Sequence, residues 1–553
     1  MHVDFIPPRL RSMRLFSRSH TNNDDDYTPV LPRLQSKKLF SRSRINDCFD
    51  ESEQAGLNEL LLNAESDLVL PCDLLTLSDM LSNERDDLQR HVECSKSLAA
   101  PIRKLPPEIL AEIFVHYATE NEISRRRVYI PGLRLAGVSG HWRSVALTTP
   151  ALWTSIRIAP VRPHHHADHM TLLHDILSRS LHRPLHICIV FDYDRENPNG
   201  SFHPAILLLF EHVARWKTFR VIDHGCAAHR YSVVNALSPI QGRLTGLSAF
   251  ECFDNREFSS LFEGATNLRS LTLSRFTSSG STIPWGQITE FTASTPVSQI
   301  IPMLTRMDKL NTLNLSYPGA YEKCHQYSVH HNLCNFHIMV DGDYTQGLAL
   351  SALLNELTLP NLRSLRISIT DKPYYTKLRF AEAPLYTGLP FAVSLIERSA
   401  PPLLHLSLFR VDFSTEQMFR LLQSVPTLKE LMLTEPLRSQ SPTLTTDFFQ
   451  QLHVRHQSLV PKLSLLEINA NTLSVDLEEE FVKVLKCRYR ESDTRKELGR
   501  IVSAKLTVQK GALDNQTVKS LMELRKLGLA VCAVDESGEI TLEESAFDLK
   551  DSL

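Results

Sequence analysis

The side chains that could bind a metal gather in two short stretches. The first holds Cys324, His325, His330, His331, Cys334 and His337, all of them ligands that zinc accepts. Their spacing matches no zinc finger, because structural sites usually present their ligands in close pairs. The second, His164–His166 with His169, precedes a segment of helical spacing over 170–181, and we interpret it as a hydrated loop. We predict no metal and no cofactor, with a zinc site in the first stretch as the alternative.

The motifs that cradle phosphates or activate nucleophiles are absent. The sequence has no G-x-x-x-x-G-K-[ST] loop, G-x-G-x-x-G turn, H-E-x-x-H helix or G-x-S-x-G elbow. We therefore predict a protein that is not an enzyme. Because catalytic triads are spatial and leave no fixed spacing, an unrecognised enzyme stays a third hypothesis.

Length and composition indicate a multidomain globular protein. The 553 residues carry 60 Lys and Arg against 63 Asp and Glu, a net charge of −3, with 42% hydrophobic residues. This balance disfavours a protein that coats nucleic acid. The chain contains neither an apolar run long enough to span a bilayer nor a secretory leader, so we expect it in the cytoplasm, the nucleus or both. Its ten cysteines form no Cys-x-x-Cys pair, and we expect them reduced and mostly buried.

The N-terminal part is predicted to lack a core. Residues 1–72 are rich in Arg, Ser and Asp, and the segment 8–19 (PRLRSMRLFSRS) recurs at 32–43 as PRLQSKKLFSRS. We predict a disordered, solvated tail there. Residues 73–100 place leucines at helical spacing between charges, which predicts one amphipathic helix that packs on the following domain.

Residues 101–158 are predicted to form a small helical domain. The stretch LPPEILAEIFV over 105–115 begins a helix, because Pro107 suits the first turn and Glu108 complements its positive end. A second helix is expected over 133–146, where apolar residues recur every three or four positions, and a short turn follows Pro150. The residues expected to close the core are Phe114, Leu135, Val138, Trp142, Val145, Leu152 and Trp153.

This combination resembles the F-box family, specifically the F-box-like proteins present in many copies in fungi. The Leu-Pro-Pro-Glu-Ile-Leu opening, the Val-x-x-x-Trp turn and the Pro-x-Leu-Trp tail carry the resemblance. In that family a three-helix module docks on the Skp adaptor subunit, which joins a cullin scaffold, a RING subunit and a ubiquitin-conjugating enzyme. The resemblance implies that adaptor contacts are made by Leu105, Pro106, Pro107, Glu108, Ile109, Leu110 and Ile113.

One feature departs from the compact form of that family. The gap between Phe114 and Val138 is longer, and it holds Arg125, Arg126 and Arg127. We expect an extended loop over 115–137 that could lie over the docking surface and weaken binding to the adaptor.

The rest of the chain repeats the pattern L-x-x-L-x-L, which predicts short parallel strands followed by helices. Clear units begin at Leu268, Leu310, Leu362, Leu403, Leu428 and Leu463, and weaker ones at Trp216 and Leu244. Helices are expected over 390–398 and 417–425. The fold class is therefore α/β, with an irregular leucine-rich-repeat solenoid over 159–475 and a C-terminal cap over 476–553; a plain α/β domain is the alternative.

The exposed strand positions would line one concave surface. Candidate target-binding residues on it are Thr272, Asn314, Arg366, His405, Glu430 and Met432. They are polar and mixed in charge, which suits a protein partner better than a nucleic acid or a membrane. The sequence thus predicts a substrate-recognition adaptor of an SCF-type ubiquitin ligase. The alternative is an F-box-like scaffold that acts outside any ligase.

Overall fold

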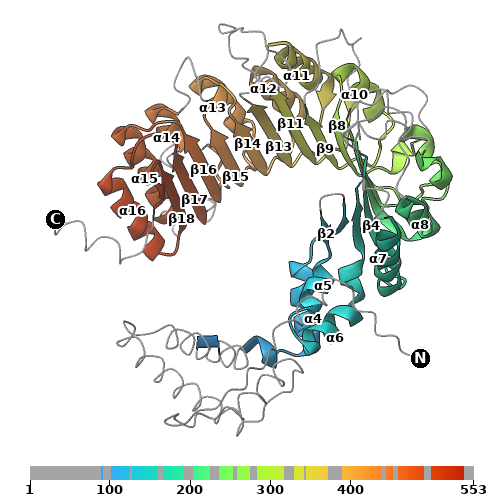
Figure 1. Cartoon of the computed structure of the whole chain (residues 1–553). Helices are drawn as coiled ribbons and strands as arrows, with labels where there is room; N and C mark the ends of the chain where they lie inside the picture. Colours follow the sequence, from blue (N-terminus) through green and yellow to red (C-terminus); the bar gives the residue numbers. More distant parts are fainter. Residues whose placement is uncertain are drawn as a thin grey trace, which may run out of the picture. The chain divides into compact units, whose positions relative to one another are not determined.

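The computed structural model describes the parts of the chain that carry its helices and strands (Figure 1). The described residues are 89–90, 101–124, 127–159, 166–191, 204–223, 236–252, 258–274, 283–316, 329–341, 344–370, 389–436, 444–452, 459–490 and 500–540. The predicted tail over 1–72 and nearly all of the predicted helix over 73–100 lie outside them.

The chain divides into two compact units, and it passes between them three times. The first, here the helical unit, comprises residues up to His116 together with Gly132–Thr148. The second, here the sheet unit, comprises Tyr117–Pro131 together with Thr149–Leu553. The predicted boundary at residue 158 therefore differs from the observed one. The segment 117–131, expected to be a loop of the helical domain, belongs to the sheet unit instead.

The helical unit is built from η2 (Pro101–Lys104), α4 (Pro107–Tyr117), α5 (Pro131–Ala136) and α6 (Gly140–Thr148). A proline opens both α4 and α5, as expected for a residue without an N–H at a position that needs no intrahelical partner. The expected single helix over 133–146 is wrong, because a turn at Gly137 to Ser139 interrupts it. The amide of Gly137 donates to Arg134 O at 3.0 Å, and Ser139 Oγ accepts from the amide of Trp142 at 3.2 Å.

The sheet unit is a mixed α/β structure whose strands are mostly parallel and mostly follow chain order (Figure 1). Seventeen described strands share one sheet, and β10 (Val329–His330) pairs separately with β12 (Leu357–Thr358). The strands of the large sheet are β1 (Asn121–Ile123), β2 (Val128–Tyr129), β3 (Ser155–Ile158), β4 (Leu185–Phe191), β5 (Trp216–Asp223), β6 (Ala249–Cys252), β7 (Ser270–Ser274), β8 (Glu290–Ser294), β9 (Thr312–Ser316), β11 (Asn335–Asp341), β13 (Ser364–Thr370), β14 (His405–Phe409), β15 (Glu430–Thr434), β16 (Leu465–Ala470), β17 (Ser503–Val508), β18 (Ala530–Asp535) and β19 (Gly538–Glu539).

Helices and 3-10 turns connect successive strands and cover one face of the sheet, leaving the other face open (Figure 1). The helices are α7 (His166–Arg179), α8 (Ala205–Glu211), α10 (Val297–Leu304), α11 (Tyr344–Glu356), α12 (Leu389–Ser399), α13 (Thr415–Gln423), α14 (Thr446–Leu452), α15 (Val475–Arg490) and α16 (Asn515–Lys526). Short 3-10 turns are η3 (Pro150–Trp153), η5 (Val213–Arg215), η7 (Ser238–Ile240), η8 (Phe258–Phe262) and η9 (Trp285–Gln287). The predicted helices over 390–398 and 417–425 correspond to α12 and α13. A Ser414–Gln417 capping box begins α13.

At each clear unit, the three apolar residues of the repeated pattern are buried, as predicted. Leu268, just before β7, and Leu271 and Leu273 within it are at most 3% exposed, because alternate strand positions point to the same covered face. The α/β fold class is therefore confirmed. One weak unit was assigned in the wrong register: Leu247, Phe250 and Cys252 form the buried set of β6, whereas Ala249 is on the opposite face.

The sheet extends beyond the predicted repeats at both ends. At its start, β1 pairs in parallel with β3 and antiparallel with β2, so the expected loop over 115–137 contains two strands of the sheet. At its end, β17 and β18 continue the parallel ladder from β16, and only β19 turns antiparallel. The predicted C-terminal cap is therefore largely two further strand–helix units.

Candidate protein-interaction surfaces

The helical unit closes around a small core. Leu110 and Phe114 of α4 have no exposed surface, and Leu135 of α5 and Val145 of α6 are at most 7% exposed. The half-buried ring of Trp142 lies 4.8 Å from that of Phe114, with the planes tilted by 56°. Three of the residues expected in this core, Phe114, Leu135 and Val145, therefore lie in it, and a fourth, Trp142, covers one side.

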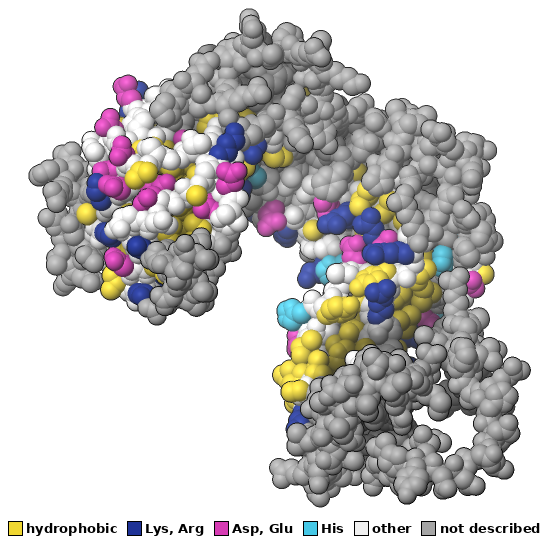
Figure 2. All heavy atoms as spheres, turned by 60° about the vertical axis from the view of Figure 1, so that its left-hand side comes forward, with side chains coloured by type: hydrophobic (Ala, Val, Ile, Leu, Met, Phe, Trp, Pro, Cys, Tyr) yellow, Lys and Arg dark blue, Asp and Glu magenta, His cyan; other side chains and the backbone are white. Residues whose placement is uncertain are grey.

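The same unit leaves many large apolar side chains in solvent. Ile109 and Ile113, one helical turn apart on α4, are 50% and 41% exposed. The other exposed large apolar residues among those described for this unit are Ile102, Leu133, Val138 and Leu147. Figure 2 shows apolar side chains gathered on this part of the molecule. We call these six residues the apolar surface.

The residues predicted to contact an adaptor divide into three groups. Pro106, Pro107 and Glu108 are exposed together with Ile109 and Ile113, so they are accessible to a partner. Leu105 is half-buried. Leu110 is wrong as a contact residue, because its side chain is completely buried in the core and has no surface to offer.

Three of the predicted core residues lie elsewhere. Val138 is 59% exposed, because the turn that separates α5 from α6 breaks the helical spacing on which the prediction depended. Leu152 and Trp153 are buried, but in the sheet unit. There the guanidinium of Arg179 lies 4.9 Å from the ring centre of Trp153.

The segment 117–131 is tied into the start of the sheet. Asn121 Nδ2 donates to Leu152 O at 2.9 Å and to Ser155 O at 2.8 Å, and its side chain is fully buried. Ile123 is also fully buried. On the surface, Arg127 Nε donates to Glu122 Oε2 at 2.8 Å. This segment therefore completes the first strands of the sheet.

The face of the sheet that carries no helices is polar. Thr272, Asn314, Arg366 and Met432 occupy equivalent positions of β7, β9, β13 and β15 in the ladder, and His405 and Glu430 are adjacent partners one row earlier. All six predicted target-binding residues are half-buried or exposed on this face. We call it the inner face.

Polar and charged side chains of the inner face lie in close pairs between neighbouring strands. Arg220 Nε lies 2.5 Å from Glu251 Oε2, His405 Nδ1 lies 2.7 Å from Glu430 Oε2, and Lys505 Nζ lies 3.2 Å from Glu467 Oε1. Arg366 is exposed and has no carboxylate partner among the described residues. Burial, and then the nearby Arg366 charge, lower the pKa of His337 in the adjacent strand.

Sequence reasoning missed a hollow at the C-terminal end of the inner face. A space of about 440 Å³ is lined by Leu465, Glu467, Lys505, Arg525, Leu529 and Cys532, among other residues of β16, β17, β18 and the turn after α16. The signal was present as Ile501-x-x-Ala504-x-Leu506, a repeat unit in which alanine replaces the middle leucine. The strand pattern therefore had to admit residues other than leucine.

The residues considered for metal binding have other roles where the structure describes them. His331 is buried, and its Nε2 lies 2.8 Å from Met307 O, whereas His337 Nε2 lies 3.4 Å from Ser368 Oγ. Cys324 and His325 lie outside the described residues. Within the described ranges no three His, Cys, Asp or Glu side chains are grouped to hold a metal. The expected hydrated loop at 164–169 is partly wrong, because His166 begins α7 and His169 is buried in it.

Disulfide bonding is described for five cysteines, and none of them forms a disulfide bond: Cys188, Cys252, Cys334, Cys487 and Cys532. Cys188 and Cys252 are buried, and burial raises the pKa of Cys188 to about 11. The prediction of reduced cysteines holds for these five, although three of them are only partly buried. A thiol with so high a pKa is a poor nucleophile at neutral pH.

No protein-family model matches the chain, and no curated protein matches it. Across the described ranges, no helix has both the length and the apolar composition needed to cross a bilayer.

Proposed function

We propose that this protein is a substrate-recognition adaptor of an SCF-type ubiquitin ligase. In this proposal the helical unit is an F-box-like domain that docks on the Skp adaptor subunit. The sheet unit is a degenerate leucine-rich-repeat solenoid that binds the target protein. The enzymatic step belongs to the partner subunits of the ligase.

The observation that carries the proposal is the apolar surface. Leu110 and Phe114 of α4 fill the core of the helical unit, so Ile109 and Ile113 on the same helix are not needed for its packing. Several large apolar side chains exposed on one small unit indicate a protein-interaction site. Ile109 and Ile113 are the two that lie on α4. They fall on the helix whose sequence, LPPEILAEIF, carries the resemblance to the F-box family.

The docking energy should come mainly from α4. Burying a complete isoleucine side chain contributes about 1.5–3 kcal/mol, so burying the half that Ile109 leaves exposed contributes roughly 1 kcal/mol. An aspartate at either position would place a charge in an apolar contact. We expect Ile109→Asp with Ile113→Asp to abolish adaptor binding and to leave the fold intact.

The test is co-purification of the full chain with a purified Skp adaptor subunit. The Ile109→Asp, Ile113→Asp variant should lose the adaptor, and Leu105→Ala, Pro106→Ala should weaken its capture. Leu207→Asp on α8 is the matched control, because Leu207 is 63% exposed on a helix of the sheet unit. Equal capture by all four proteins would contradict the proposal.

A scaffold outside any ligase is the competing hypothesis. It shares the binding surfaces but predicts no adaptor in the complex. Failure of the purified adaptor to co-purify with the folded full chain would favour the scaffold.

A further inference from the structure

The edge at which the parallel strands begin carries one row of backbone hydrogen bonds and many cations. Successive residues in this row are linked from strand to strand: Ser248 N donates to Lys217 O, Thr289 N to Arg269 O, Leu404 N to Arg363 O and Ser464 N to Lys429 O. We call it the entry row. In order it contains Lys217, Ser248, Arg269, Thr289, Asn311, Cys334, Arg363, Leu404, Lys429, Ser464 and Val502.

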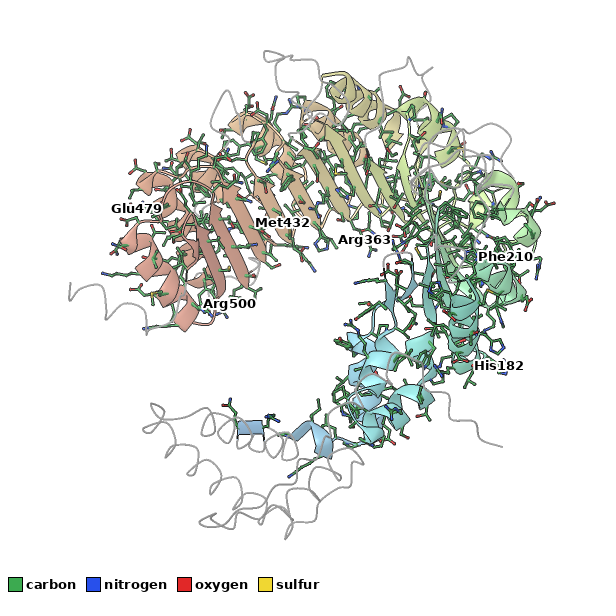
Figure 3. The ribbon with its side chains drawn as sticks, viewed as in Figure 1. His182, Phe210, Arg363, Met432, Glu479 and Arg500 are labelled. Atoms are coloured by element: carbon green, nitrogen blue, oxygen red, sulfur yellow. The ribbon has the colours of Figure 1, made fainter. Side chains whose placement is uncertain are left out.

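The entry row has four cations and no anion. Lys217, Arg269, Arg363 and Lys429 are all exposed. The described turns that lead into the row add four more exposed cations, Arg243, Lys309, Lys462 and Arg500, against the carboxylates Glu263 and Asp308. Figure 3 shows Arg363 and Arg500 on the same edge of the sheet. We call these eight cations the basic rim.

The basic rim differs from the inner face in whether its cations have carboxylate partners among the described residues. On the inner face, Arg220, His405 and Lys505 each have a carboxylate within 3.2 Å. None of the eight rim cations forms an ion pair with a carboxylate of the described residues. Arg243 and Arg269 donate to backbone carbonyls, which carry no formal charge. An unbalanced row of charge attracts a ligand of opposite sign.

We infer that the basic rim binds an extended acidic segment of a protein partner. This inference deepens the target-binding half of the proposed function and rests on it. Lys217 and Arg269 are two strands apart, as are Arg363 and Lys429, which places each pair about 10 Å apart. An extended peptide advances about 3.3 Å per residue, so acidic residues at every third position match this spacing.

The chemistry of the rim favours a peptide over a nucleic acid. Single-stranded nucleic acids are held by aromatic side chains that stack on the bases, and the entry row contains no aromatic residue. The neighbouring inner-face positions Thr272, Thr292 and Asn314 supply small hydrogen-bonding groups that suit a peptide backbone. At the C-terminal end the rim reaches the hollow lined by Leu465, Leu529 and Arg525, which offers an apolar pocket beside a cation.

The test measures binding of a labelled Glu-Ser-Ser repeat peptide of about twelve residues, the length of an extended chain that spans several of these strands. Fluorescence anisotropy is recorded on the full chain at low ionic strength, because salt screens exposed charges. The Arg363→Glu, Lys429→Glu variant should bind about tenfold more weakly or worse, since both attractions become repulsions. The control Lys510→Glu, Arg420→Glu has the same net charge, and both positions are exposed away from the rim.

Unchanged peptide binding in the rim variant would overturn the inference, as would an equal loss in the control. Tighter binding of a single-stranded oligonucleotide of equal charge, or of phosphatidylserine vesicles, would also overturn it. If thermal unfolding shows that the first variant is not folded, Lys217→Ser with Arg269→Ser replaces it and should weaken binding several-fold. Capture of the Skp adaptor is measured on the same proteins. If the unmodified chain does not capture the adaptor, the proposed function is contradicted. The inference about the basic rim is tested by peptide binding alone.

Discussion

The helical unit and the sheet unit treat apolar side chains in opposite ways. The helical unit exposes Ile102, Ile109, Ile113, Leu133, Val138 and Leu147 within fewer than fifty residues of sequence. Over the far longer described part of the sheet unit, the exposed large apolar residues are Tyr117, Val128, Leu181, Leu207, Val475, Val502 and Leu527. Scattered exposed leucines are ordinary on any protein surface, whereas a dense group on a small unit indicates an interface.

The surfaces described for the sheet unit are instead rich in charged side chains. The sheet unit carries the paired charges of the inner face and the cations of the basic rim. One chain therefore offers an apolar contact on one unit and a polar, basic contact on the other. In the proposed function, these two contacts serve partners of different chemistry.

The largest expected effect comes from the core of the sheet unit. Phe250 is 1% exposed, and its ring centre lies 5.5 Å from that of Phe219 and 4.8 Å from that of Phe262. Phe250→Ala should lower the free energy of unfolding by about 3–5 kcal/mol, because it removes apolar burial and leaves a cavity. Urea denaturation of the full chain measures it, with Ile109→Ala as the comparison, for which a loss below about 1 kcal/mol is expected.

A buried cation gives the next largest effect. Arg488 of α15 is 2% exposed, and its guanidinium donates to Leu452 O, Leu459 O and Val460 O at 3.0, 2.7 and 3.0 Å. Burial lowers its pKa to about 10, so it remains protonated at neutral pH. Arg488→Met should cost about 2–4 kcal/mol, because three carbonyls lose their donor.

Urea denaturation measures this change too. The exposed Arg420→Met on α13 is the matched control, and it should change the free energy of unfolding by less than about 0.5 kcal/mol. Similar losses in both variants would show that the hydrogen bonds from Arg488 to Leu452, Leu459 and Val460 contribute little to stability.

A smaller effect concerns pH, and it belongs to the sheet unit. Burial lowers the pKa of His331, which is 6% exposed, below the ordinary histidine value of 6.5. As the pH decreases through 6.5, the unfolded chain binds a proton that the folded His331 does not, so stability falls. The slope contributed by one such group is at most about 1.4 kcal/mol per pH unit.

His331→Gln isolates this contribution. Its amide can still donate to Met307 O, the partner of His331 Nε2 at 2.8 Å, but it does not titrate. The difference in free energy of unfolding between pH 7 and pH 5 should be smaller in the variant than in the unmodified chain. An identical pH dependence would assign the loss to other groups, among them His186 and His337, whose pKa values are also lowered by burial.

The sequence predicted the strands best where leucine recurs. The units at Leu268, Leu310 and Leu428 were placed correctly, because leucine fits the buried strand positions of these repeats. The unit Trp216-x-x-Phe219-x-Val221, which has no leucine, was also placed correctly as β5. The prediction failed at two other units without leucine. Trp153-x-x-Ile156-x-Ile158 and Ile288-x-x-Phe291-x-Ala293 form β3 and β8 with the same burial and were overlooked.

The shortest strands could not be predicted from the sequence, for a different reason. β1 and β2 have three and two residues, too few for an alternating pattern, and they exist because β1 pairs with β3. The long gap after Phe114 was noticed, but length alone does not say where an insertion packs. In the helical unit the LPPEIL helix was predicted correctly, whereas the exposed or buried state of Leu110 and Val138 depended on the helix partners.

The smallest expected effect on stability is also the sharpest test of the apolar surface. Val138 occupies the turn between α5 and α6 and is 59% exposed, so Val138→Asp should change the free energy of unfolding by less than about 0.5 kcal/mol. If Val138 lay in the core, as the helical spacing alone predicts, the buried carboxylate would cost several kcal/mol and unfold the unit. Val475→Asp is the control, because Val475 is 51% exposed in the sheet unit. Both variants should therefore melt like the unmodified chain, and a weaker capture of the adaptor by Val138→Asp alone would extend the docking surface from α4 to this turn.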